Sequence, residues 1–392
     1  MRYKLSNNAF SGFILISTLS IAFSSQIGDF KFSNKFVYSI LAVWILIAFY
    51  KFIADGFNIK DTNFKSVLKI FFKYNFYPKL IIYIYTLVLI FLNITEKRFL
   101  SSNIQTFINA VSAIVIVYLY KNKAFKYSLI ALIISYLYAL IGSFFTHGVY
   151  FFDYLEFHDM AFGSGYIIIY FFLIKSKWEK KDVKYVFFVS LITIAAFKRI
   201  ELAALFIVFL LYIFLSKFSF KKRKRIISVF SCIFILICYV YVYTILNEEI
   251  WIWFSKLGIN VSGRNFYYQV AAYLSDFKVT FLGLGRNSMA TIFTNEYSYL
   301  KVGNLHSDIL RMYVECGFIL FGIWLFIYLF KMPKSIYLNF GYKSMLCLFM
   351  CTLYTFIVYF TDNTELYLVN QYFYMLIPIH YTLSVNNYLQ KP

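Results

Sequence analysis

About twelve apolar segments divide the 392-residue chain, and they constrain its fold more than any other feature. A helix needs roughly 20 mostly apolar residues to cross a bilayer, and the shorter segments can be extended by flanking aromatic and lysine residues at the interface. The chain is 61% hydrophobic and only 14% charged, which is too apolar for a water-soluble core. The pattern predicts an all-α, polytopic membrane helix bundle of about 12 transmembrane helices, with a large external loop containing short helices. The predicted spans are Ala9–Ser25, Phe36–Ile53, Leu80–Ile94, Phe107–Tyr120, Tyr127–Phe145, Met160–Ile174, Tyr185–Phe197, Ile200–Leu215, Ile226–Leu246, Leu310–Phe330, Ser344–Phe360 and Tyr367–Val385.

The charges indicate how the spans are oriented. If the N-terminus is cytoplasmic, the loops on that side hold 26 of the 38 basic residues and only four of the 18 acids, as the positive-inside rule requires. Lys79 is counted among these basic loop residues, just before the third span. We therefore expect both termini in the cytoplasm and the lipid bilayer as the partner of the basic charge, and we do not expect nucleic acid. The run from Lys221 to Arg225 is expected to lie near anionic lipid.

The spans divide the chain into three parts. Residues 1–246 hold transmembrane helices 1–9, residues 247–309 form the large external loop, and residues 310–392 hold helices 10–12. The seventh and eighth spans are either two crossings or one hairpin interrupted at Lys198-Arg199. Within the loop, Ser262 is expected to cap a short amphipathic helix that runs from Gly263 to about Leu274. Its apolar face is predicted to hold Phe266, Val270 and Tyr273.

Polar side chains that could carry chemistry gather in and beside this loop, and loops of such length tend to be functional. Guanidinium groups bind phosphate oxygens in bidentate fashion, and glycines allow the backbone to approach an anion. His306 is a candidate general base, although His158 is a rival. Asp308 and Glu315 could orient the base or bind sugar hydroxyls. No acidic pair or His/Cys cluster predicts a bound metal, and no cofactor is expected. The candidates are Lys198, Arg199, Arg264, Gly283, Gly285, Arg286, His306, Asp308, Arg311 and Glu315.

Each candidate also has a purely structural interpretation. Lys198 and Arg199 could be interface anchors, and the two glycines could simply form a turn. Asp308 could cap the following helix. Glu315 could be a buried acid that pairs with Arg311 one turn earlier. The sequence leaves these alternatives open.

The order of the loop elements resembles a known family. Ser262-Gly263-Arg264, Gly283-Leu284-Gly285, His306-Ser307-Asp308 and Glu315-Cys316-Gly317 precede an apolar helix, as in the Wzy O-antigen and capsule polymerases and the related O-antigen ligases. The resemblance covers residues 262–317, with further support from Lys198-Arg199. It implies 10 to 14 helices, arginines (here Arg199 and Arg264) that bind a lipid diphosphate, and a histidine base (here His306). The resemblance assigns no role to Arg286, and its role in substrate binding is inferred from its chemistry alone.

This resemblance implies an enzyme of the plasma (inner) membrane. The expected activity is metal-independent, inverting glycosyl transfer that polymerises polyprenyl-diphosphate-linked oligosaccharide repeat units into O-antigen or capsular polysaccharide. A flippase and chain-length regulator proteins are the expected partner proteins. Two alternatives stay open: a ligase that transfers the glycan to a lipid A core, and a lipid-linked oligosaccharide flippase or other transporter. Transporters usually show repeats and mid-membrane charges, and neither is evident in the sequence.

Overall fold

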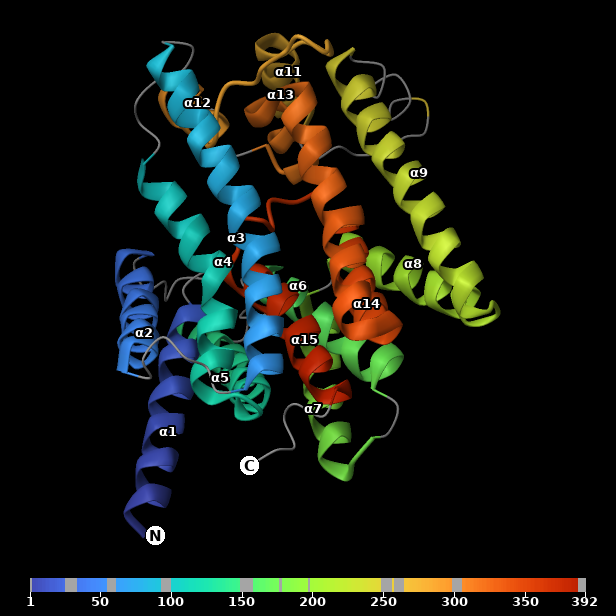
Figure 1. Ribbon diagram of the computed structural model, residues 1–392. Coiled ribbons are helices and arrows are strands. Elements are labelled where there is room, and N and C mark those ends of the chain that lie inside the picture. Colours follow the sequence, from blue (N-terminus) through green and yellow to red (C-terminus); the bar gives the residue numbers. More distant parts are fainter. Residues whose placement is uncertain are drawn as a thin grey trace.

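The computed structural model of the protein describes residues 2–24, 34–54, 61–92, 100–148, 158–175, 178–196, 198–247, 256, 264–297 and 305–386. The regular elements in these ranges are all helices (Figure 1). In chain order they are α1 (Arg2–Ser24), α2 (Asn34–Ala54), α3 (Thr62–Phe91), α4 (Leu100–Tyr120), α5 (Lys123–His147), α6 (His158–Ile169), η2 (Tyr170–Ile174), α7 (Lys180–Ala196), α8 (Arg199–Ser216), α9 (Phe220–Leu246), α11 (Arg264–Leu274), α12 (Ser288–Asn295), α13 (Asp308–Phe326), η4 (Ile327–Lys331), α14 (Met332–Val358) and α15 (Leu368–Val385).

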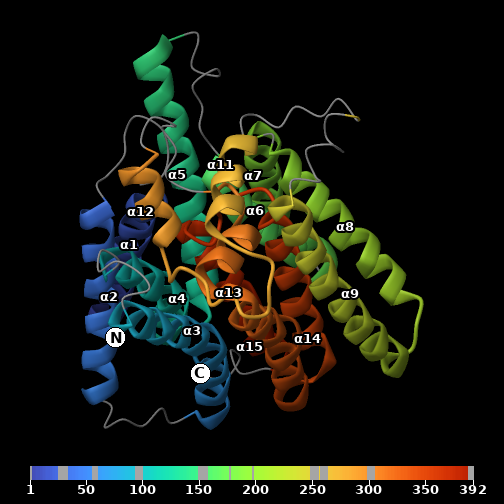
Figure 2. The same ribbon diagram turned by 90° about the horizontal axis from the view of Figure 1, so that it is seen from above.

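Helix α15 lies at the centre of the bundle. It packs against α4, α6 and α14, and residues 344–359 and 368–379 are buried without exception. The view from above places α1 and α2 on one side and α8 and α9 on the other, with α13 and α15 between them (Figure 2). The outer helices instead present large apolar side chains outwards, including Phe206, Leu210 and Leu236. Apolar surface of this extent favours contact with lipid over water.

The helices are those of a membrane protein. Six segments of the described chain are long and apolar enough to cross a bilayer. They are Lys35–Ala54, Thr62–Phe91, Lys123–His147, Arg199–Ser216, Phe220–Leu246 and Asp308–Val358. Three further apolar helices, Phe10–Ser24, Gln105–Tyr120 and Ala161–Ile174, are shorter. The prediction of a helical membrane protein is thus confirmed.

The 51-residue segment Asp308–Val358 folds back on itself at Gly341. That glycine has φ 84° and ψ 178°, which are not helical values. Beyond it the chain runs antiparallel to the preceding helix, since Phe356 lies 4.9 Å from Trp324 and 6.1 Å from Tyr328 between ring centroids. The predicted spans Leu310–Phe330 and Ser344–Phe360 lie on opposite sides of this turn.

Three local predictions need correction. The third span does not begin at Leu80, because α3 starts at Thr62. Its N-cap is Asp61, whose Oδ1 accepts hydrogen bonds from the Asn63 and Phe64 amides at 3.0 Å. Lys79 is therefore a buried residue inside a helix and does not lie in a loop. The short loop helix is present (α11) and ends at Leu274, while its predicted cap, Ser262, lies outside the described residues. Its apolar face is only partly the predicted one: Tyr268, Val270 and Ala271 are buried, whereas Phe266 and Tyr273 are 56% and 84% exposed.

The seventh and eighth predicted spans are two separate helices, α7 and α8. Lys198 stands between them with extended backbone angles and is the N-cap residue of α8. The helical segment is interrupted at Lys198-Arg199, where the sequence predicted a break, and the residues on each side of the break form a separate helix. This break places Lys198 and Arg199 at the start of α8.

A second glycine, Gly317, lets two backbones meet. It has φ 76°, and a Cβ at this position would lie 2.3 Å from the Leu282 carbonyl carbon. A Cβ on Gly283 would lie 2.4 Å from the Gly317 nitrogen. The amides of Leu284 and Gly285 donate to the carbonyls of Val314 and Glu315 at 2.9 and 2.8 Å, and the Phe318 amide donates to Phe281 at 3.0 Å. Residues 281–285 thus supply partners for the carbonyls freed by the helix break.

We expect Gly317→Ala to lower the free energy of unfolding by at least about 1–3 kcal/mol, the usual cost of a strained backbone. The clash with Leu282 should add to that cost. Gly341→Ala is the matched control, because Gly341 has a similar φ of 84° but nothing within 4 Å of an added Cβ. Thermal unfolding of the purified protein measures both. Equal losses in the two variants would mean that the contact at Gly317 contributes nothing.

Candidate functional site

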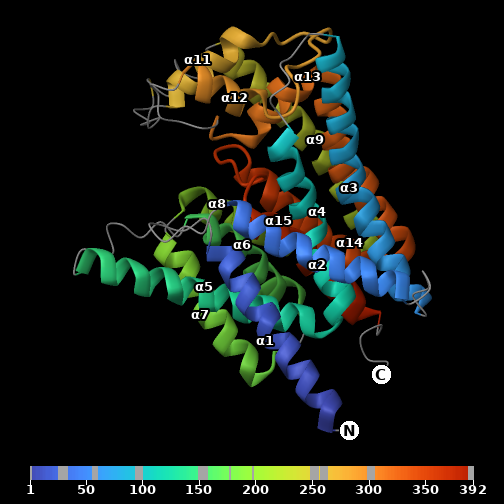
Figure 3. The ribbon, with the colours of Figure 1, turned by 90° about the vertical axis from the view of Figure 1, so that its left-hand side faces the viewer.

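The connection between α14 and α15 organises the polar residues of the molecule. It lies about halfway along the structure, beneath α11, α12 and the start of α13 (Figures 1 and 3). Asp362 and Glu365 on this connection point to two different groups of charges. We call the group around Glu365 the inner charge cluster (Lys79, Arg286, Asp308, Arg311, Glu315 and Glu365) and the group around Asp362 the histidine site (Lys198, Arg264, His306 and Asp362).

The start of α13 is hydrogen-bonded to this connection. Ser307 caps α13 by accepting from the Leu310 amide at 3.2 Å, so Ser307, and not Asp308, is the N-cap. The amides of Asp308 and Ile309 donate to the carbonyls of Asp362 and Tyr359, each at 3.1 Å. The Glu365 amide donates to Asp308 Oδ2 at 2.6 Å. These bonds fix His306 and Asp308 relative to Asp362 and Glu365.

The inner charge cluster is a buried network of ion pairs. Glu365 accepts from both arginines, from Arg311 Nη2 at 2.7 Å and from Arg286 Nη2. Arg286 Nη1 also binds Glu315 Oε2 at 2.9 Å. Arg311 Nη2 binds Asp308 at 2.5 Å, and its Nη1 lies 3.8 Å from Glu315. Burying such charges is expensive unless they are paired, and three cations balance three anions here.

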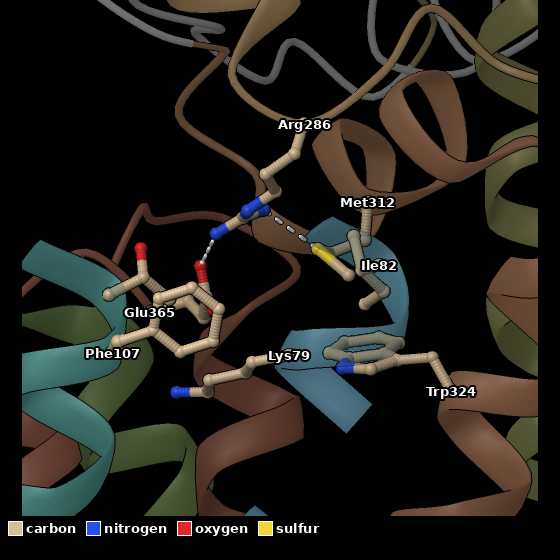
Figure 4. Close-up of a pocket in the computed structure, with 8 residues that line it drawn as sticks. Lys79, Ile82, Phe107, Arg286, Met312, Trp324 and Glu365 are labelled. Atoms are coloured by element: carbon tan, nitrogen blue, oxygen red, sulfur yellow. Dashed lines mark hydrogen bonds and ion pairs between the residues drawn. The ribbon is translucent and has the colours of Figure 1, made fainter. Parts of the chain in front are cut away.

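Lys79 joins this cluster from below and has fewer partners. Its ammonium donates to Gln371 Oε1 at 3.1 Å, and Gln371 in turn donates to the Tyr359 hydroxyl at 2.9 Å. Figure 4 shows Arg286 reaching Glu365 from one side while Lys79 lies on the other. Two small cavities adjoin Lys79 and Glu365. In each of them the centre of a water-sized sphere can occupy a volume of about 10 Å³. That is roughly the space one water needs, so neither cavity accommodates a sugar.

The charges change the acidity of Glu365 and Arg286. Burial acts to raise the pKa of Glu365, but Arg286, Arg311 and Lys79 outweigh it, and the pKa falls to about 2. Burial acts to lower the pKa of Arg286, but Glu365 and Glu315 reverse this and the pKa rises. Both groups are ionised at neutral pH. The inner charge cluster is therefore a set of matched ion pairs.

The histidine site lies on the other side of the same connection. Lys198 at the start of α8 binds Asp362 Oδ2 at 3.0 Å, and Tyr367 donates to Asp362 Oδ1 at 3.2 Å. His306 has a left-handed backbone (φ 49°), and its ring lies 5.9 Å from that of Tyr267 on α11. Non-glycine residues seldom adopt such backbone angles, and those that do often lie at functional sites.

The surroundings of His306 favour its neutral form. Burial lowers its pKa, the positive charges of Arg264 and Lys198 lower it further, and Asp362 opposes them. A neutral imidazole has one nitrogen that can accept a proton. The arrangement therefore provides a base among cationic side chains, which is suited to an anionic substrate.

The structure brings most predicted site residues together, in two groups. Lys198, Arg264 and His306 belong to the histidine site, while Arg286, Asp308, Arg311 and Glu315 belong to the inner charge cluster. Arg199 is exposed at the first residue of α8, and no contact with either group is found within the described residues. The amides of Leu284 and Gly285 donate to backbone carbonyls within the fold, so these two amides are not free to bind an anion. The His158 side chain lies outside the described residues.

Sequence reasoning missed Lys79, Asp362 and Glu365. Two signals could have found them. Lys79 follows Pro78 in a stretch that stays apolar on both sides, and Asp362-Asn363-Thr364-Glu365 is a compact acidic run between two spans. Hydropathy alone starts the third span too late and so places Lys79 in a loop. Asp362 and Glu365 do lie in a connection, where hydropathy gives no sign that a charge is buried.

No group of three or more His, Cys, Asp or Glu side chains in the described ranges is arranged to hold a metal ion. The side chains of the histidine site can bind an anion, through Lys198 and Arg264, and can transfer a proton, through His306. Comparison with known proteins adds no family: no protein-family model matches this chain, and no curated protein matches it significantly.

Proposed function

We propose that this protein is a membrane glycosyltransferase that polymerises polyprenyl-diphosphate-linked oligosaccharide repeat units into O-antigen or capsular polysaccharide. The observation that carries the proposal is the histidine site. A half-buried histidine with a lowered pKa lies in the electrostatic reach of Arg264 and Lys198, at the end of the bundle where the loop helices gather. This combination is what the resemblance to the Wzy polymerases and O-antigen ligases leads one to expect.

In this proposal each residue of the histidine site has a distinct task. Arg264 and Lys198 bind the diphosphate of the donor and stabilise the charge that develops as it leaves. His306 accepts the proton of the acceptor hydroxyl, whose oxygen attacks the anomeric carbon with inversion. Asp362 holds Lys198 in position. Diphosphate is a good leaving group, so the reaction needs no cofactor.

The inner charge cluster takes a supporting role. Arg286, Arg311, Asp308 and Glu315 were expected to bind substrate, but their partners are one another and Glu365. We assign them to holding the α14–α15 connection and the start of α13 in register, which positions His306 and Asp362. Arg199, exposed beside Lys198, remains available to a lipid-linked diphosphate that approaches from the membrane.

The proposed topology follows from the charges. About 12 crossings, with both termini in the cytoplasm, put residues 247–309 on the outer face of the plasma (inner) membrane. Residues 1–246 and 310–392 then form the membrane domain. A flippase would deliver the lipid-linked units to this face, and chain-length regulators would act on the growing polymer there.

Two alternatives remain in view. A ligase that transfers glycan to a lipid A core would use the same site with another acceptor. A transporter is favoured by one observation, because Lys79 is buried midway along α3 beside Glu365, and buried charges often mark transport pathways. Against it, the cavities at Lys79 hold about one water, and the cluster charges are mutually paired.

The decisive experiment compares surface polysaccharide from cells that lack the gene and carry either wild type or Arg264→Ala. Polymerisation predicts a ladder of long chains with wild type and single repeats with Arg264→Ala, with both proteins inserted at equal levels. Lys278→Ala is the matched control, because Lys278 is an exposed loop cation paired with Asp276. Long lipid-linked chains that never reach a core would indicate the ligase, and units trapped inside would indicate the flippase. Long chains from Arg264→Ala would contradict the assigned site.

A further inference from the structure

Glu201 is a buried acid that the proposed reaction does not use. It lies in the first turn of α8, one turn after Lys198, and its side chain is fully buried. Helices α6, α7 and α14 close around its carboxyl group with three hydroxyls. Ser164 Oγ lies 3.4 Å from Glu201 Oε1, and the hydroxyls of Thr193 and Tyr354 adjoin the same carboxyl.

Each of these hydroxyls also has a backbone carbonyl within reach of its single proton. Ser164 Oγ lies 2.6 Å from the Ala161 carbonyl, Thr193 Oγ1 lies 3.2 Å from that of Val189, and the Tyr354 hydroxyl lies 3.1 Å from that of Phe162. A hydroxyl has only one proton to donate, so a carboxylate at Glu201 competes with these carbonyls for its donors. The second oxygen of Glu201, Oε2, is buried without a hydrogen-bond partner. A proton on the carboxyl removes this competition, because the acid can then donate to the hydroxyl oxygens.

No described side chain places a positive charge in direct contact with the carboxyl. Lys198, the N-cap residue of α8, is the cation that acts on it from a distance, and its ammonium is bound to Asp362 at 3.0 Å. The titratable groups that face the carboxyl are thus Lys198, from the start of α8, and Tyr354, from α14. From α6 and α7 it meets only the hydroxyls of Ser164 and Thr193. An unpaired carboxylate inside a membrane bundle is costly.

We propose that Glu201 is a proton-binding site inside the bundle, at which one exchangeable proton bridges the carboxyl and the surrounding hydroxyls. The proton is favoured over a metal cation because the Ser164 and Thr193 oxygens lie 2.5 Å apart. That separation is the length of a short hydrogen bond and leaves no space for a cation between them.

The site is linked to the histidine site through α8. Loss of the proton places a negative charge one helical turn from Lys198, where it competes with Asp362 for the ammonium. Occupancy of Glu201 therefore biases the ion pair that holds the start of α8 to the α14–α15 connection. This consequence stands whether the histidine site transfers sugars or serves another reaction.

The test is labelling of the membrane-embedded, full-length protein with a hydrophobic carbodiimide, followed by peptide mass spectrometry. The reagent takes the carboxyl proton on nitrogen while the carboxyl oxygen adds to its central carbon, so the whole reagent adds with no leaving group. We expect modification of Glu201 that declines as pH rises and is lost in Glu201→Gln. Asp182 and Glu365 are the internal controls, because both are buried but paired with cations.

A second measurement is needed in case the carbodiimide cannot reach Glu201 inside the bundle. The infrared band of a protonated carboxyl should be present in wild type and missing in Glu201→Gln, whose amide is nearly isosteric with the acid and should leave the melting temperature unchanged. Absence of both the adduct and the band would overturn the proposal. Protection from labelling by sodium but not by potassium would also overturn it, since the site would then hold a metal cation.

Discussion

Glu365→Ala is expected to lower the free energy of unfolding by about 3–5 kcal/mol, the range for removing one partner of a buried ion pair. The loss is large because two buried cations form ion pairs with the Glu365 carboxylate. Glu365 binds Arg286 and Arg311 together, and both guanidinium groups would remain buried with fewer partners. Total stabilities of domains are roughly 5–15 kcal/mol, so the loss is a large fraction of the whole. Thermal unfolding of the purified protein in detergent measures it.

The matched control is Asp276→Ala. Asp276 also pairs with a cation, Lys278 at 3.0 Å, but both side chains are more than two-thirds exposed. Exposed pairs contribute about 0–1 kcal/mol, so this variant should unfold close to wild type. Glu365→Gln should fall between the two, because it keeps a hydrogen-bond acceptor but loses the charge. Similar behaviour of Glu365→Ala and Asp276→Ala would mean that the inner charge cluster does not hold the fold.

Acid should reduce the difference between Glu365→Ala and wild type. The pKa of Glu365 falls from an ordinary 4.5 to about 2 in the folded protein. A lowered carboxyl pKa contributes stability that is complete above the unfolded pKa and is lost as pH falls through the folded one. The advantage of wild type should therefore be full above about pH 4.5 and shrink between there and pH 2.

The sequence was sufficient to predict the class of the fold because lipid imposes a simple rule. Apolar segments separated by basic loops indicate membrane helices. The loop helix α11 was also expected, although its predicted cap, Ser262, lies outside the described residues. Span ends were less predictable. α3 begins at Thr62, directly after its cap residue Asp61, and carries Lys65, Lys69 and Lys73 in its first half, so hydropathy starts the span too late. The burial of Lys79 depends on its partner Gln371, 292 residues away in the chain, which no local pattern encodes.

The candidate site was predictable in part for the same reason. Arg264, His306 and Lys198 stood out because each is a charged or titratable residue in a short polar motif. How those residues are grouped depends on the α14–α15 connection, which contacts both the start of α13 and the start of α8. Gly283 illustrates the limit. Its neighbour Arg286 suggested an anion site, but its contact with Gly317 arises from a helix break that only the folded chain reveals.

His306→Ala is expected to slow chain extension by about 10²–10⁴-fold, the usual contribution of a general base. His306→Gln should be equally slow, because it retains a polar side chain but cannot accept the proton at neutral pH. His380→Gln is the matched control, since that histidine is stacked on Phe125 at 4.6 Å in α15 and has no part in the proposed reaction. The measurement is the rate of polymer formation from a lipid-linked repeat unit in membranes, at equal protein levels.

The pH profile separates a base from a residue that merely holds the loop. His306 is active when neutral, and its lowered pKa keeps it neutral further into acid than an ordinary histidine, so extension should fail only below pH 6.5. Lys198→Met removes a positive neighbour and should raise that pKa, which moves the acid limit to higher pH. Asp362→Asn removes the negative neighbour and should move the limit to lower pH. Shifts in these opposite directions follow from the charges around a titrating imidazole, whereas a loss of packing would lower the rate at every pH and leave the limit in place. An acid limit that neither variant moves would exclude His306 as the base.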